Sequence, residues 1–200
     1  EELIKIRHLD AELLSTSSLA LGRVRLELIE MSKVISDMHN RSLEVISKGS
    51  PTDLLELAKE DAKVDLLHQE IISYMGKISG NELSENEATE LANMFEITNA
   101  LETIGDIIET DMVGLGRQRI KQQLYISPQT KIVLDGIHKM VGQSLELVAS
   151  SLSFDTRDDT AKIIEMKSKF NRLIESAHLH QMVRLTADES KRLQTYSLEV

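Results

Sequence analysis

Hydrophobic side chains recur along most of this chain at spacings of three and four residues, the pattern of one buried face on an α-helix. The first such stretch contains Leu21, Val24, Leu28, Met31, Ile35 and Met38. A second runs from Leu54 to Ile78 and another from Leu134 to Leu152. The pattern predicts long amphipathic helices, and because the breaks between them are short, it predicts an all-α bundle of antiparallel neighbours.

Capping residues predict where these helices begin. A serine ahead of a proline, and a Ser or Thr three residues ahead of a Glu, both suit the free N–H groups of a first helical turn. The predicted starts are 15–18, Ser50-Pro51, Ser84, Ser127-Pro128, Phe154 to Thr156, and Thr186. We therefore expect two three-helix sets, residues 15–126 and 127–200, with the sixth helix truncated.

Composition and charge narrow the function classes. The chain has 200 residues, 23 Lys and Arg, 33 Asp and Glu, a net charge of −10 and no cysteine. Disulfides, zinc fingers and iron–sulfur clusters are excluded, and the lack of a basic stripe argues against nucleic acid as a partner and against binding to anionic membrane. No phosphate loop or nucleophile motif occurs, so we expect no enzymatic activity and no catalytic residues.

Polar residues fall on the hydrophobic stripe of the second predicted helix. Asp61 and His68 occupy positions on that stripe, and Asp65 lies one turn after Asp61. The third predicted helix carries a comparable polar stripe of Asn99, Glu102, Asp106 and Glu109. Like charges one turn apart repel each other, and a divalent or trivalent cation would cancel that repulsion. The alternative is that these acids lie on solvated helix faces, and spacing alone leaves both interpretations open.

Two acidic stretches carry a resemblance to a known family. The sequences from Asp61 to Asp65 and from Glu102 to Asp106 each place an acid and an aspartate four positions apart, with three residues between them. They resemble the repeated acidic motif of the PhoU family. The context from Asn99 to Asp106, with a glycine before the last acid, is similar to that family's third-helix signature. The opening from Leu9 to Leu21 is similar to the linker and first helix of the PhoU-like tail of bacterial sodium/phosphate cotransporters.

The resemblance implies a PhoU-like tandem of two antiparallel three-helix bundles at the cytoplasmic face of the inner membrane. Residues 1–14 would then be a linker from a preceding membrane domain, which would be the partner, and a homo-oligomer is a further expectation. The implied function is regulation of a sodium-dependent phosphate transporter. The implied ligands for iron, zinc or a similar ion are Asp61, Asp65, Asn99, Glu102 and Asp106.

The second half of the chain departs from the family motif. Lys169 stands where the motif would place an acid after Glu165, so a second metal site is not expected there.

Two other functions are considered. Glu175 and His178 match the Glu-x-x-His spacing of di-iron bundles, but that chemistry needs two such motifs. The alternative to a metal-binding regulator is a purely structural module, in which the hydrophobic faces serve dimerisation or docking and the acids are solvated.

Overall fold

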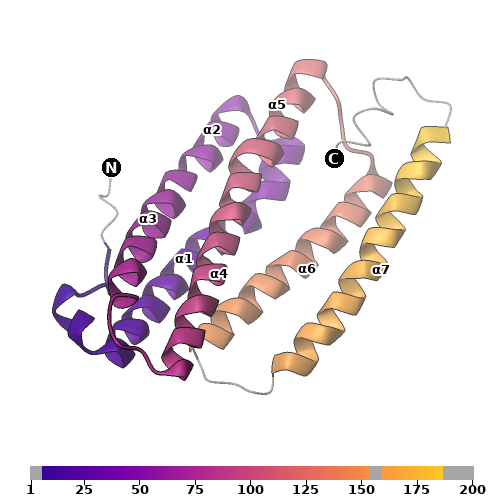
Figure 1. The fold of residues 1–200 in the computed structure, drawn as a ribbon. Helices are drawn as coiled ribbons and strands as arrows, with labels where there is room; N and C mark the ends of the chain where they lie inside the picture. The colour runs from indigo at the N-terminus through magenta and orange to yellow at the C-terminus, as the bar shows by residue number, and fades with distance from the viewer. Residues whose placement is uncertain (1–5, 154–158, 187–200) are drawn as a thin grey trace.

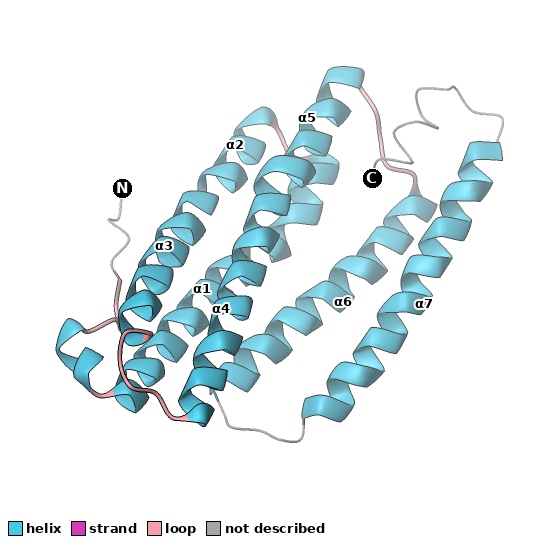
Figure 2. Ribbon diagram, viewed as in Figure 1, coloured by secondary structure: helices cyan, strands magenta, loops and turns pink. Residues whose placement is uncertain are grey.

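The computed structural model describes residues 6–153 and 159–186, and this part of the chain is helical with no strand (Figures 1 and 2). A 3-10 helix, η1 (Ala11–Ser15), precedes the first α-helix, and a π-helix, η2 (Ile107–Met112), joins α4 to α5. The α-helices are α1 (Ser17–Lys48), α2 (Pro51–Lys59), α3 (Asp61–Ile78), α4 (Glu85–Asp106), α5 (Val113–Gln122), α6 (Pro128–Ser153) and α7 (Asp159–Thr186). The predicted all-α fold class is confirmed.

Three of the predicted helix starts coincide with hydrogen-bonded caps. The Ser84 hydroxyl accepts from the Glu87 amide at 3.3 Å while the Glu87 carboxylate accepts from the Ser84 amide at 2.9 Å. Ser50 forms the same reciprocal cap with Asp53, and the Ser127 hydroxyl accepts from the Thr130 amide at 3.2 Å. The predicted start at Phe154 to Thr156 and the helix predicted after Thr186 lie outside the described residues.

Two helices predicted as continuous are interrupted. The stretch that follows Pro51 breaks at Glu60, which forms an ion pair with Arg41 of α1. The helix that starts after Ser84 passes into η2 before it continues as α5. Buried positions in this region are Leu101, Gly105, Ile108, Val113 and Gly116, with a five-residue step between Ile108 and Val113 that matches the wider π turn.

The core is centred on α1, which packs against α3, α4, α5 and α6 (Figure 1). The predicted hydrophobic faces of α1 and of α2 with α3 are buried, as Leu28, Ile35, Leu57 and Ile71 are fully enclosed. The α6 face is less covered: Leu145 and Leu152 are buried, whereas Ile137 is half-buried. The α7 helix packs against α6, so the first half of the chain supplies most of the described core.

The segment ahead of α1 is fastened to the bundle, although residues 1–14 are expected to be a linker. The buried Glu27 carboxylate accepts from the His8 amide at 2.7 Å. Tyr74 donates its hydroxyl hydrogen to the Asp10 carbonyl at 2.6 Å, and the Asn81 amide donates to the Leu14 carbonyl at 2.7 Å. Within the described residues, each helix is too short or too polar to cross a membrane.

Candidate metal site on α3 and α4

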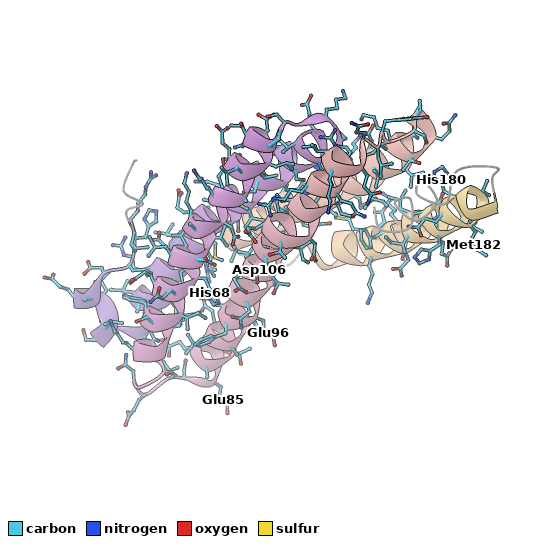
Figure 3. The ribbon with its side chains drawn as sticks, turned by 90° about the horizontal axis from the view of Figure 1, so that it is seen from above. His68, Glu85, Glu96, Asp106, His180 and Met182 are labelled. Carbon is cyan, nitrogen blue, oxygen red and sulfur yellow. The ribbon has the colours of Figure 1, made fainter. Side chains whose placement is uncertain are left out.

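Three of the predicted ligands converge where the start of α3 meets the end of α4. Asp61 and Asp65 occupy the first turns of α3, and Asp106 is the last residue of α4. One carboxylate oxygen from each of the three lies within 4.8 Å of the others. Figure 3 labels Asp106 of α4 and His68 of α3. The antiparallel packing of α3 and α4 therefore brings together acids that are far apart in the sequence.

Asp61 differs from its two neighbours in being buried. Its residue exposure is 6%, whereas Asp65 and Asp106 are exposed. Its Oδ1 atom has no hydrogen-bond partner among the described residues. Burial raises the pKa of Asp61 to about 6, and the negative charges of Asp65, Asp106, Glu109 and Glu102 add to the shift. A buried, unpartnered carboxylate is costly, so a positive ligand at this place would stabilise the protein.

Gly105 explains how α4 can approach this carboxylate. A Cβ atom at Gly105 would lie 2.5 Å from Asp61 Oδ1, 3.2 Å from Val64 and 3.4 Å from Ile35. Any larger residue at this position would have to push the Asp61 side chain or the helix aside. The absence of a side chain at Gly105 therefore allows the Asp61 oxygen to lie this close to α4.

The other two predicted ligands lie apart from this cluster. Asn99 Oδ1 is 3.0 Å from Nε2 of His68 and pairs with that ring. Glu102 is half-exposed and acts on Asp61 through its charge, but its carboxylate is not one of the three that converge. The structure thus brings together Asp61, Asp65 and Asp106 of the five predicted residues.

The cluster fits a hard metal ion. Carboxylate oxygens bind Ca²⁺ at about 2.3–2.6 Å, so two ligands on opposite sides of the ion lie about 4.6–5.2 Å apart. The oxygens of Asp61, Asp65 and Asp106 have separations within that limit. Smaller ions such as Mn²⁺ or iron need a closer approach, which the exposed Asp65 and Asp106 side chains can make by rotation. Three protein oxygens leave further positions of the metal to water.

Two contributors to this site were not chosen as ligands from the sequence. Glu109 was noted on the polar stripe, and its charge acts on Asp61. Gly105 was noted only as part of the family signature, and the structure gives it a steric role. A small residue one position before a stripe acid is the signal that could have predicted a close helix approach.

The corresponding stretch of the second half shows a different arrangement. Lys169 forms an ion pair with Glu165 at 2.7 Å, and both side chains are exposed. The prediction that this stretch has no metal cluster stays a prediction, because part of α7 has side chains outside the described set.

Comparison with protein families places the acidic cluster inside a known domain. Residues 28–110 match the PhoU domain. This stretch contains α2, α3, α4 and most of α1, and it includes Asp61, Asp65 and Asp106. The helical hairpin that carries the three acids thus lies within the stretch that is PhoU-like in sequence.

Curated relatives extend the similarity over nearly the whole chain. A Salmonella typhimurium protein named "Putative inorganic phosphate export protein YjbB" is 24% identical over 198 residues. The proteins of that name from Escherichia coli O157:H7 and Escherichia coli strain K12 are each 23% identical over 198 residues. The alignments cover 98% of this chain and 36% of each relative, so the chain spans about a third of their length. No solved structure matches the chain.

Proposed function

We propose that this chain is a regulatory or accessory domain in phosphate transport and that it binds a metal ion through Asp61, Asp65 and Asp106. The observation that carries the metal site is the buried Asp61 carboxylate, whose Oδ1 lacks a partner among the described residues and faces two further carboxylates. The PhoU domain match and the similarity to phosphate export proteins support the link to phosphate. The proposed role is non-enzymatic.

The proposed site works by charge neutralisation. At neutral pH, three carboxylates within 4.8 Å repel one another, and Asp61 is held away from water. A divalent or trivalent ion would bind all three and draw the start of α3 to the end of α4. Because the metal would bind the folded chain and not the unfolded one, it would raise stability with its concentration.

Metal binding can be tested with a charge-matched pair of variants. D61N/D106N removes two acids of the cluster, and the control E70Q/E96Q removes two exposed acids from the same helices, α3 and α4. Thermal unfolding would be followed with Mn²⁺, Fe²⁺, Zn²⁺ or Ni²⁺, beside elemental analysis of protein purified without chelators. We expect the ions to stabilise the wild type and the control but not D61N/D106N. Metal-free protein without any thermal shift would instead support the structural module.

We further propose that the domain belongs to a sodium-dependent phosphate transporter and acts at the cytoplasmic face of the membrane. The resemblance of residues 9–21 to a transporter tail supports this assignment, and the relatives are named as phosphate exporters. Radiolabelled phosphate uptake and release would be measured in cells that carry the parent gene, with and without sodium. Sodium-dependent fluxes that change in D61N/D106N are expected. Fluxes that are independent of sodium would reject the cotransporter assignment while leaving the metal site intact.

A further inference from the structure

The α1 and α6 helices are joined by a reciprocal contact between two histidines. The rings of His39 and His138 stack with their centroids 3.9 Å apart and an interplanar angle of 18°. Nε2 of His39 lies 2.9 Å from the His138 carbonyl oxygen, and Nε2 of His138 lies 2.7 Å from the His39 carbonyl oxygen. Each ring thus donates to the backbone of the other helix, 99 residues away in sequence.

The contact fixes where the protons of both rings lie. A carbonyl oxygen can only accept, so both Nε2 atoms must carry a hydrogen. In a neutral ring the other nitrogen, Nδ1, is then free of hydrogen and is the atom that takes up a further proton. A proton on each ring would place two positive charges face to face in a largely apolar setting. The geometry therefore favours neutral rings.

The surroundings of the pair do little to offset a positive charge. His39 is 5% exposed, and burial lowers its pKa; the hydrogen bond with the His138 backbone opposes this shift, and the neighbouring His138 ring adds to it. On the cavity side, α4 and η2 contribute apolar residues, which are Ile104, Ile107, Ile108 and Met112.

Other titratable groups face the pair from α1, α6 and α7. On the α1 and α6 side, a small pocket beside His138 is lined by Glu44, Lys48, Lys131 and Asp135. The Lys131 ammonium donates hydrogen bonds to both carboxylate oxygens of Asp135, at 2.6 and 2.7 Å. From α7, His178 and His180 line the cavity, and His180 Nε2 is 3.0 Å from the Thr130 hydroxyl oxygen. Among the described residues, neither ring of the stacked pair forms an ion pair with a carboxylate.

We propose that His39 and His138 form a pH-sensitive clasp, in which neutral rings fasten α6 to α1 and protonation loosens this crossing. The same rings line a cavity of about 500 Å³ between α1, η2, α6 and α7, so the state of the clasp also sets the shape of that cavity. The inference does not depend on the proposed metal site, because His39 and His138 lie outside the acidic cluster.

The direction of the pH effect follows from the lowered pKa of His39. An imidazole whose pKa is lower in the closed form than its ordinary 6.5 takes up protons more readily when the helices separate. The contribution of the clasp is therefore complete above pH 6.5 and declines as the pH falls below that value toward the lowered pKa. Below both the ordinary and the lowered pKa, the loss of stabilisation no longer changes with pH.

Direct titration and amide exchange of the whole 200-residue chain test the proposal. In NMR spectra, we expect the Cε1 proton of His39 to titrate below pH 6.5. Relative to unstructured-peptide rates, protection of the α6 amides should fall as the pH drops from roughly 7.5 to 5.5, and one titrating ring can change this equilibrium by at most about tenfold per pH unit. Titration of His39 at its ordinary value would overturn the clasp without any variant being made.

Glutamine variants separate the clasp from general acid sensitivity. In H39Q/H138Q, the side-chain amides can still donate to the opposite carbonyls but cannot titrate. We expect the pH dependence of α6 protection to disappear in this variant. The control H178Q removes a different histidine that lines the cavity and should keep the wild-type pH dependence. An unchanged pH response in H39Q/H138Q, or its loss in H178Q, would contradict the assignment.

Discussion

The start of α3 and the first part of α7 are corresponding stretches of the two halves, but their charged residues have different surroundings. Asp61 is enclosed beside Asp65 and Asp106, and its Oδ1 has no partner in the described structure. Glu165 is exposed, and the Lys169 ammonium one turn later holds the pKa of its carboxyl below the ordinary value. At the two motif positions, the α3 stretch has two acids, whereas the α7 stretch has one acid and a lysine. The two stretches also differ in that Asp61 is buried without a counter-charge, so a cation bound there would offset an uncompensated negative charge.

The two regions also differ in how firmly they are packed. Helices around α1 in the first half enclose Leu28, Ile35 and Ile71 completely. The described part of α6 and α7 leaves Ile137 half-buried and Leu179 and Val183 largely exposed. An acid can be kept out of water only where the surrounding helices are closely packed. The first half meets that condition around Asp61.

The largest expected effect tests this difference in packing. Ile71→Ala should destabilise the protein by about 2–5 kcal/mol, because it removes a fully enclosed side chain and leaves a cavity. Ile137→Ala, at a half-buried position, should cost about 1 kcal/mol. Urea unfolding of both variants measures the two losses. Equal losses would show that the two halves are packed alike.

A smaller effect is expected at the close approach of α4 to α3. Gly105→Ala places a Cβ atom 2.5 Å from Asp61 Oδ1 and should cost about 1–3 kcal/mol through overpacking. Metal-dependent stabilisation should weaken in the same variant. Gly114→Ala is the matched control, because its Cβ would meet nothing within 4 Å and should stabilise α5 by about 0.5–1 kcal/mol. Chemical denaturation with and without metal would measure both changes in the free energy of unfolding. The prediction is wrong unless Gly105→Ala lowers the stability and Gly114→Ala raises it.

Asp61→Asn should increase stability in the absence of metal at neutral pH. The Asp61 pKa of about 6 lies above the ordinary 3.8, so the folded chain holds this proton more tightly than the unfolded chain does. The contribution of this group is therefore complete below pH 3.8 and is lost as pH rises through about 6. Asparagine removes that loss, and a gain of about 1–3 kcal/mol is expected at pH 7. The free energy of unfolding of both proteins would be measured as a function of pH. Parallel curves for the variant and the wild type would refute the prediction.

Glu165→Gln should have the smallest effect. Its ion pair with Lys169 is exposed, and such pairs contribute little to stability. The lowered pKa of Glu165 means that any stabilisation is present at neutral pH and fades in acid. The same unfolding experiment at pH 7 should therefore give a slight loss, opposite in sign to Asp61→Asn. A gain would indicate that Glu165 is repelled by other acids.

Local signals in the sequence predicted much of the fold. Ser50, Ser84 and Ser127 were assigned as helix starts because their hydroxyls can satisfy the first-turn amides, and the caps are formed. Hydrophobic spacing likewise predicted the buried faces of α1 and α3. The break at Glu60 could not be predicted in this way, because Glu60 is a good helix former and the hydrophobic spacing continues across it.

The candidate site was predicted less completely than the fold. Spacing could place Asp61, Asp65 and Asp106 on helix faces, but the register between α3 and α4 decides which oxygens meet. That register also pairs Asn99 with His68 and leaves Glu102 outside the cluster. The pairing of His39 with His138 was not predicted, because it joins helices 99 residues apart and neither residue belongs to a motif.

The π-helix η2 also determines the direction in which α5 faces. A π turn holds more residues than an α turn, so the segment after it is rotated backward about the helix axis. This rotation places Gly116 against Leu54 and lets Arg119 donate to the carbonyls of Ile46 and Gly49 at the end of α1. Loss of one residue within η2 would turn α5 by about 100°, the step per residue of an α-helix. The length of this chain between Asp106 and Gly116 is thus as constrained as the identity of its buried side chains.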